Sequence, residues 1–273
     1  MLTADPRARW PRAQQRDRMW QLVMPLTVAI PLVLVWQLVP GRGNILIPTF
    51  STFAIAVGQT MLSAEFWQAL ATSELALLVG YLAAIVVGIP LGMAMGRYRW
   101  LEAAADPYVN IALITPLALV MPIVLMVFGL TFQARVVVIF MFAITFVVVP
   151  CRAGILTITE NLWEMCRGYG ASELQLWREL LLPGSLPAVM TGLRQGLAHA
   201  ISGMLLAELT LLAVGLGKLI LDAQGHYDSA TIFAVVFLLI VQSVLLLSGL
   251  SWLERRVRGA AMDKTTVLSM EGA

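Results

Sequence analysis

The polar side chains best suited to contact a small molecule are concentrated in one apolar stretch, residues 188–213. Thr191, Gln195, His199 and Ser202 recur there at helical spacing and would form one stripe along a helix. At 1.5 Å per residue, His199 lies about 17 Å along this stretch. Polar groups at such a depth in a membrane face the interior of a helical bundle or a water-filled path. We therefore predict that Gln195, His199 and Ser202 line a substrate pathway; the alternative is a hydrogen bond between neighbouring helices.

Glu208 is the acidic residue of the same stretch. It follows His199 by nine residues, a turn of about 180°, so it would lie on the opposite side of the helix. Its position along the helix is close to the outer membrane interface. An acidic side chain inside a membrane span is a candidate functional group, and we include Glu208 among the pathway candidates. The alternative is that it reaches external water or a partner chain.

Motifs for catalysis or cofactor binding are missing. The pattern G-x-x-x-x-G-K-[ST] of ATP-binding loops is absent, because Gly217-Lys218 lacks the upstream glycine and is followed by leucine. H-E-x-x-H, G-x-S-x-G and cysteine clusters are also absent. The two histidines, His199 and His226, are isolated in the sequence. The two cysteines, Cys151 and Cys166, are interpreted as free thiols. We expect no enzymatic activity, no metal or cofactor held by this chain, and no nucleic-acid partner.

The composition indicates that these residues are positioned by membrane-spanning helices. Of 273 residues, 59% are hydrophobic and 12% are charged, whereas soluble domains average about 25% charged residues. A bilayer core needs about 20 apolar helical residues per span. We predict an all-α transmembrane fold with six spans at about 19–39, 75–96, 107–129, 136–157, 188–213 and 230–253.

The distribution of arginine and lysine predicts the orientation. The tail of residues 1–18 carries five arginines, at positions 7, 9, 12, 16 and 18, and the span that follows is interpreted as a retained signal anchor. Basic residues concentrate in alternate loops, which marks the cytoplasmic side. We expect both termini in the cytoplasm, including the tail of residues 259–273. Arg152, near the inner end of its span, is expected to reach the cytoplasmic head groups.

Two stripes of small residues predict closely packed helices. Small faces allow the backbones of membrane helices to approach one another. One stripe lies in the second span, at Gly80, Ala84, Gly88, Gly92 and Gly96. The other lies in the fifth span, at Gly192, Gly196, Ala200, Gly203 and Ala207.

The loop of residues 158–187 is not built like a linker. Gly170 is suited to close a first short helix in the left-handed conformation. Ser172 would start a second helix, with Gln175 at the capping-box position. Three apolar residues share one face of that helix, and two prolines are expected to end it: Leu174, Trp177 and Leu181, then Pro183 and Pro187. An exposed apolar face predicts docking to a partner; the alternative is a helix lying on the membrane or on its own bundle.

This loop resembles the EAA loop of bacterial ABC importer permeases at Glu164-Met165-Cys166, Gly170-Ala171-Ser172, Leu182-Pro183 and Leu186-Pro187. In that family the pattern is Glu-Ala-Ala, three residues, Gly, and a short helix ending at Leu-Pro. Met165 and Cys166 replace the two alanines, whereas the glycine keeps its spacing. The resemblance covers residues 70–258 and includes Pro116-Leu117-Ala118, Met121-Pro122, Phe128-Gly129, Thr191-Gly192-Leu193-Arg194, Gly215-Leu216-Gly217, Ile220-Leu221-Asp222-Ala223 and Leu253-Glu254-Arg255-Arg256. This combination is similar to the nitrate/sulfonate/taurine-type subfamily.

The resemblance implies a six-helix type I importer permease in the inner membrane of a bacterium. It implies a second permease subunit, identical or a paralogue, two ATP-binding subunits and a periplasmic substrate-binding protein. The loop would be the coupling helix region, through Glu164, Gly170, Ala171, Ser172, Leu174 and Trp177. Substrates in such families are small anions, sulfonates, carboxylates or thiamine-precursor pyrimidines. A self-contained secondary transporter or channel and an intramembrane enzyme remain the alternatives.

Overall fold

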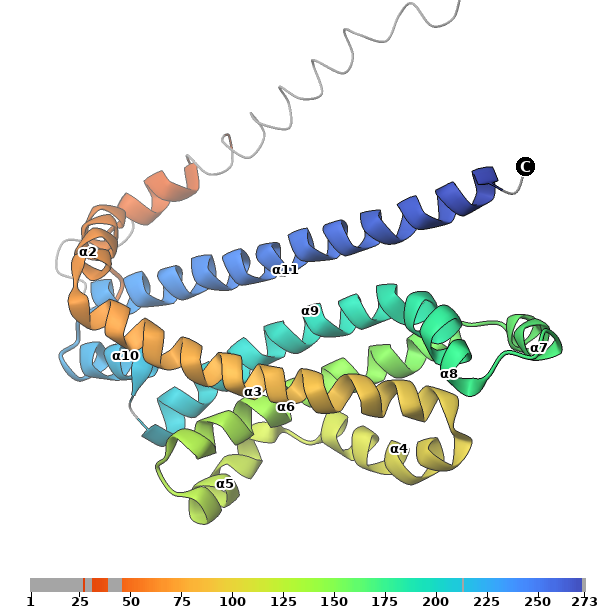
Figure 1. The fold of residues 1–273 in the computed structure, drawn as a ribbon. Coiled ribbons are helices and arrows are strands. Elements are labelled where there is room, and N and C mark those ends of the chain that lie inside the picture. The colour runs from red at the N-terminus through yellow and green to blue at the C-terminus, as the bar shows by residue number, and fades with distance from the viewer. Residues whose placement is uncertain (1–26, 28–30, 39–45, 213, 272–273) are drawn as a thin grey trace, which may run out of the picture.

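The computed structural model describes residue 27 and residues 31–38, 46–212 and 214–271, and its regular elements there are helical (Figure 1). The predicted tail of residues 1–18 and most of the predicted span 19–39 lie outside the described residues. The elements are α2 (Phe50–Leu62), α3 (Ala64–Arg97), α4 (Arg99–Ile114), η2 (Leu117–Val120), α5 (Met121–Phe128), α6 (Phe132–Leu156), α7 (Glu160–Gly168), α8 (Glu173–Gln175), η3 (Leu176–Leu181), α9 (Leu182–Ala207), η4 (Glu208–Leu212), α10 (Gly215–Gly225) and α11 (Ser229–Glu271).

Three long helices form the centre of the bundle, with α6 packed against both α3 and α9. A Cβ atom added to Gly88 of α3 would lie 2.9 Å from a methyl group of Val147 in α6. One added to Gly196 of α9 would lie 2.6 Å from the other methyl group of the same valine. Both small-residue stripes therefore face α6, and the prediction that they allow close packing is confirmed.

Three described helices are long and apolar enough to cross a membrane, and they are Ala64–Arg97, Phe132–Leu156 and Ser229–Arg256. Two bent helix pairs raise the number of possible spans in the described residues to five. One of these pairs contains the polar stripe of α9.

The predicted span 107–129 is not one continuous helix. The chain bends there by 97° between α4 and α5. Proline restricts the residue before it to extended conformations, and Thr115 before Pro116 has φ −76° and ψ 122°. The helix therefore ends at Ile114 and starts again beyond the proline.

Pro183 and Pro187 do not end the second helix of the loop, contrary to the prediction. Helical structure continues from Glu173 through η3, a π-helical turn, into α9. The Leu182 N–H donates to the Trp177 carbonyl in the wider π register. The change of register accommodates proline, which has no N–H group to donate. An ordinary α-helical hydrogen-bond ladder does not accommodate such a residue.

Two helices lie where the sequence suggested only loops. Helix α2 falls within residues 40–74, and α10 falls within residues 214–229. Both lie at one end of the bundle, whereas α7 and α8 lie at the opposite end (Figure 1). We refer to these as the α10 end and the α7 end. Aromatic contacts join α2 to α11 at the α10 end, including Phe53 on Phe237 with ring centroids 5.5 Å apart.

Candidate functional site: a helical loop, a polar stripe and a buried carboxylate

Gly170 makes the turn between α7 and α8. Its φ is +77°, the left-handed conformation that glycine adopts without steric cost. Its N–H donates to the Arg167 carbonyl at 2.9 Å, and the Ala171 N–H donates to the Cys166 carbonyl at 3.0 Å. These two bonds form a Schellman motif, which satisfies the last carbonyls of α7. The predicted helix-closing role of Gly170 is confirmed.

Ser172 and Gln175 form the predicted capping box at the start of α8. The Ser172 N–H donates to the Gln175 side-chain oxygen at 2.8 Å, and the Gln175 N–H donates to the Ser172 hydroxyl oxygen at 3.4 Å. Two otherwise unpaired amides are thereby satisfied within four residues. Together with the turn at Gly170, this makes the loop a defined structure.

The exposed apolar surface of the loop differs from the predicted one. Leu174 is exposed, but Trp177 is half-buried and Leu181 is completely buried against α6 and α9. The prediction of one exposed face through these three residues is therefore wrong beyond Leu174. An exposed apolar row lies instead along α7 and the residue that follows it, at Leu162, Met165 and Tyr169, where the tyrosine is 87% exposed. Spacings of three and four residues place this row on one side of the helix.

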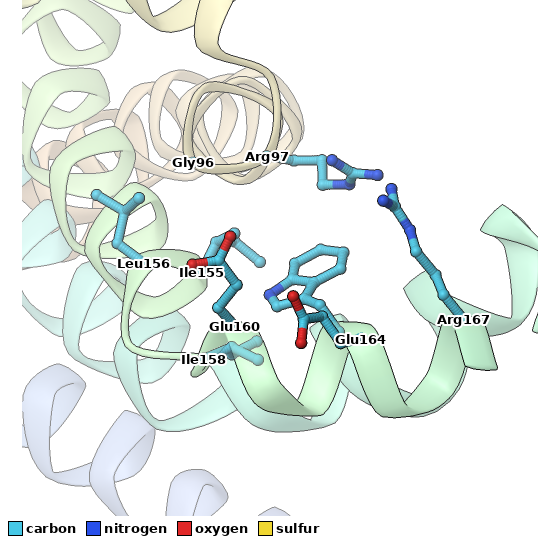
Figure 2. Close-up of a pocket in the computed structure, with 9 residues that line it drawn as sticks. Gly96, Arg97, Ile155, Leu156, Ile158, Glu160, Glu164 and Arg167 are labelled. Atoms are coloured by element: carbon cyan, nitrogen blue, oxygen red, sulfur yellow. The ribbon is translucent and has the colours of Figure 1, made fainter. Parts of the chain in front are cut away.

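A pocket of about 350 Å³ separates the other side of α7 from the ends of α3 and α6 (Figure 2). Arg97 of α3 reaches across it, with its guanidinium 4.6 Å from the centre of the Trp163 ring. The same guanidinium donates to the Glu173 carboxylate at 2.8 Å. These contacts attach both helices of the loop to the end of α3. Glu164 also lines the pocket, is exposed, and makes no ion pair with a described residue.

The predicted polar stripe is only partly covered by the rest of the chain. Gln195 and Ser202 are exposed on α9, and the Ser202 hydroxyl donates to the Ala198 carbonyl of its own helix. His199 is half-buried, and its ring stacks on Phe146 of α6 with centroids 3.3 Å apart. The structure therefore brings Gln195, His199 and Ser202 onto one face and fixes the histidine ring against α6. Among the described residues, none of these three side chains makes the hydrogen bond between helices that was the alternative.

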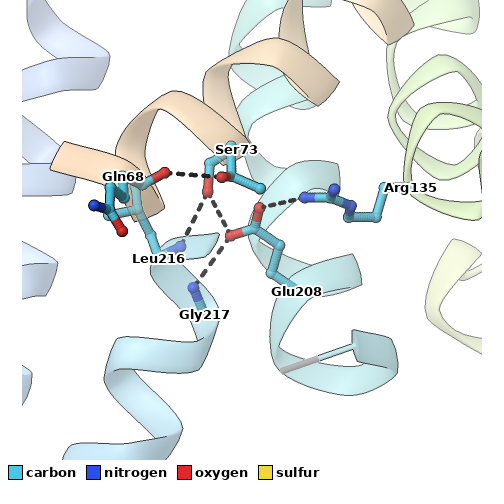
Figure 3. Close-up of polar contacts among 7 residues, drawn as sticks. Gln68, Ser73, Arg135, Glu208, Leu216 and Gly217 are labelled. Carbon is cyan, nitrogen blue, oxygen red and sulfur yellow. Dashed lines mark hydrogen bonds and ion pairs between the residues drawn. The ribbon is translucent and has the colours of Figure 1, made fainter. Parts of the chain in front are cut away.

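Glu208 does not lie on this stripe, and it reaches neither external water nor a partner. Its side chain is completely buried, and its carboxylate accepts from the Ser73 hydroxyl at 2.9 Å and from the Gly217 N–H at 3.1 Å (Figure 3). The guanidinium of Arg135 lies 3.5 Å from its other oxygen. In this conformation its carboxylate faces buried partners and no open path, and a role of Glu208 in the substrate pathway stays a prediction. Arg135 stands directly before the predicted span 136–157, and its opposite charge was the one clue in the sequence to the partner of Glu208.

Arg152 pairs with two acidic residues of a neighbouring helix, and its predicted reach to the head groups stays a prediction. It donates to Glu102 at 3.1 Å and 2.5 Å and also to Asp106, both on α4. The two carboxylates are four residues apart and therefore share one face of the helix. The ion pairs hold the start of α4 against the end of α6.

Comparison with known proteins decides the family. Residues 85–259 match the family described as binding-protein-dependent transport system inner membrane component. The chain belongs to this family. The permease is 27% identical to the taurine transport system permease protein TauC of Escherichia coli K12 over 258 residues, 91% of each chain. It is 30% identical to the riboflavin transport system permease protein RibX of Chloroflexus aurantiacus over 244 residues, covering 88% of the permease and 91% of RibX. It is 28% identical to the bicarbonate transport system permease protein CmpB of Synechococcus elongatus over 255 residues, with the same coverage.

The fold of the permease is that of ABC importer permeases. A chain of the MetNI methionine ABC transporter, in an inward-facing conformation, superposes with a TM-score of 0.55 at 22% identity. The match covers 72% of the permease and 94% of that chain. The permease is therefore the membrane component of an importer in the inner membrane, and it crosses that membrane more than once. It is not itself an enzyme: ATP is handled by an ATPase partner, and the transport system also includes a binding protein.

Proposed function

We propose that the permease is one half of the membrane channel of a bacterial importer for a small anion. The transporter would contain two permeases, identical or paralogous, two ATP-binding subunits and one periplasmic binding protein. The observation that carries this proposal is the folded loop at the α7 end, which presents an exposed apolar row on a rigid, capped scaffold. Apolar surface of this kind on a defined helix is suited to a protein partner.

We place the α7 end and both termini in the cytoplasm. The alternation of basic residues along the chain supports this orientation. It puts the loop where an ATP-binding subunit can reach it, and it puts the α10 end in the periplasm, where a binding protein can dock.

In the proposed coupling mechanism, Leu162, Met165 and Tyr169 insert into a groove of the ATP-binding subunit, and Leu174 extends this surface. Gly170, Ala171 and Ser172 keep the two short helices at a fixed angle through the Schellman motif and the capping box. Trp177 anchors the second helix to the bundle. Glu164, which has no ion-pair partner among the described residues, is available to a basic side chain of the ATP-binding subunit.

Gln195, His199 and Ser202 would line the substrate path. An amide and an imidazole donate hydrogen bonds, and the Ser202 hydroxyl donates one when it turns away from the Ala198 carbonyl, which suits the oxygens of a small anion. Two of the relatives are named for taurine and bicarbonate, and these names support a small anion. RibX, named for riboflavin, shows that family members at this level of identity also serve a larger substrate.

The decisive experiment is reconstitution with the ATP-binding subunit and binding protein encoded beside the permease gene. We expect a stable complex and ATP-dependent uptake of the ligand that co-purifies with that binding protein. If the permease transports alone, driven by an ion gradient, it is a secondary transporter and the proposal fails.

The path residues are tested in the same system. His199→Ala and Ser202→Ala should each lower uptake about tenfold, since each removes a polar group at membrane depth. The control is Thr72→Ala, because Thr72 is also exposed and its hydroxyl bonds only within its own helix, to the Gln68 carbonyl. Equal uptake in all three variants would remove the stripe from the path.

A further inference from the structure

Helix α10 has no local cap, and its first amides are satisfied by two other elements. Val214 at the N-cap position contributes no side-chain hydrogen bond. The Leu216 N–H donates to the Ser73 hydroxyl of α3 at 3.0 Å, and the Gly217 N–H donates to the Glu208 carboxylate of η4 at 3.1 Å. A carboxylate at a helix N-terminus is also favoured by the helix dipole. The start of α10 is therefore held by α3 and η4.

The glycines of α10 fit closely around the same two side chains. A Cβ atom on Gly215 would lie 2.3 Å from the Ser73 hydroxyl oxygen and 2.5 Å from a Glu208 carboxylate oxygen. One on Gly217 would lie 2.6 Å from the Glu208 Cβ. Gly215 also has φ +62°, where other residues are strained. No larger residue fits here, so the first turn of α10 sits directly on Glu208.

Arg135 of α6 balances the buried charge of Glu208. The guanidinium and the carboxylate are 3.5 Å apart, and their side chains are 8% and 0% exposed. Removing one member of such a pair leaves an uncompensated charge in the interior, which costs far more than the pair itself contributes. Four elements therefore meet at this carboxylate: α3, α6, η4 and α10 (Figure 3).

We propose that Glu208 is a positioning residue of the transport cycle. With Ser73 and Arg135 it fixes α10 across the outer end of the bundle, so that α10 and α9 move as one body. This rests on the proposed function, which places the α10 end on the side of the binding protein. A displacement of α10 by that protein is then transmitted to α9 and to the stripe of Gln195, His199 and Ser202.

The first test measures hydrogen exchange at Leu216 and Gly217 in the purified full-length permease. Glu208→Ala should speed exchange at both amides about tenfold or more, because the buried cap is lost. Ser73→Ala should speed exchange mainly at the Leu216 amide, which donates to the Ser73 hydroxyl. The matched control is Thr210→Ala, in the same π-helical turn, because the Thr210 hydroxyl bonds only to the Leu206 carbonyl. Unchanged exchange in Glu208→Ala would overturn the proposal.

The pair is tested by Glu208→Gln, Arg135→Met and the double variant. Each single variant leaves one buried charge unpaired, whereas the double variant leaves none, so it should exchange more slowly than either single variant. This comparison also tests the proposal if the Glu208→Ala variant does not fold. Additive effects would overturn the role of the ion pair.

The second test measures ATP hydrolysis in the reconstituted transporter, as the ratio of rates with and without loaded binding protein. This ratio should fall about tenfold in Glu208→Gln and recover in the double variant. Faster exchange with an unchanged ratio would make the contacts merely structural and overturn the proposal. If no ATP-binding subunit associates at all, the proposed function fails instead. The exchange measurement then still tests whether Glu208, Ser73 and Arg135 hold the start of α10.

Discussion

At the scale of single residues, Gly170 offers a clean separation of backbone strain from steric collision. An added Cβ atom would meet nothing within 4 Å, yet the φ of +77° disfavours any residue that has one. Gly170→Ala should therefore destabilise the turn by about 1–2 kcal/mol. We expect uptake to fall more than ATP hydrolysis, since the loop would still dock but at a variable angle.

Gly168→Ala is the matched control for this substitution. Gly168 also has open space around its Cβ position, but it lies in α7 with ordinary helical backbone. Uptake in Gly168→Ala should equal that of the unaltered permease, because alanine favours a helix over glycine by about 1 kcal/mol. Equal losses in the two variants would mean that the left-handed turn is irrelevant to coupling.

The exposed row on α7 gives a second residue-scale prediction. Met165→Asp places a charge on the surface proposed to enter the ATP-binding subunit, and desolvating that charge on docking is costly. Co-purification of the ATP-binding subunit should fall about tenfold or more. Leu182→Asp is the control, since Leu182 is an exposed leucine outside the row. If the Leu182 variant alone loses the subunit, the docking surface lies elsewhere.

At the scale of helices, a packed glycine and an open glycine predict opposite effects of one chemical change. A Cβ atom on Gly92 of α3 would lie 2.4 Å from the Val148 carbonyl oxygen of α6, and backbone cannot move aside easily. Gly92→Ala should lower the free energy of unfolding by about 1–3 kcal/mol. Gly58→Ala in α2, where nothing lies within 4 Å, should raise it by about 0.5–1 kcal/mol. Thermal unfolding in detergent measures both, and destabilisation of similar size in the two would contradict the packing argument.

Local patterns in the sequence were sufficient for several elements. The turn at Gly170, the capping box at Ser172 and the two small-residue stripes depend on residues within a few positions of each other. The bend at Thr115 was not foreseen, because prolines inside membrane helices often leave the helix continuous. Pro183 and Pro187 behave in that second way, through a π-helical turn. Sequence alone gives no rule for choosing between these outcomes.

At the scale of the whole molecule, the orientation of the bundle can be tested by labelling. Leu174 is exposed at the α7 end and Gln224 is exposed at the α10 end. In a Cys166→Ser background, with Cys151 buried, Gln224→Cys should react with a membrane-impermeant maleimide in intact spheroplasts. Leu174→Cys should react only after lysis. The reverse pattern would invert the proposed topology.

Contacts between distant parts of the chain account for most of what the sequence left open. Glu208 meets Ser73 and Arg135, which are 135 and 73 residues away. Helical periodicity describes one helix at a time, so it assigned Glu208 to a side of its helix without naming what covers that side. Helices α2 and α10 were missed for a related reason, since they lie in segments that are too short or too polar to register as spans.

The position of α6 between two glycine-bearing helices has a consequence for how the permease can evolve. A helix bordered on one side tolerates substitutions at regular intervals, wherever its free face recurs. Helix α6 is bordered on two sides, by α3 and by α9, and Val147 contacts glycines from both. In a saturation library scored by growth on the transported nutrient, α3 and α9 should show tolerance that rises and falls with the helical repeat. The profile of α6 should be nearly flat and low, so that its sequence drifts most slowly among the helices of the bundle.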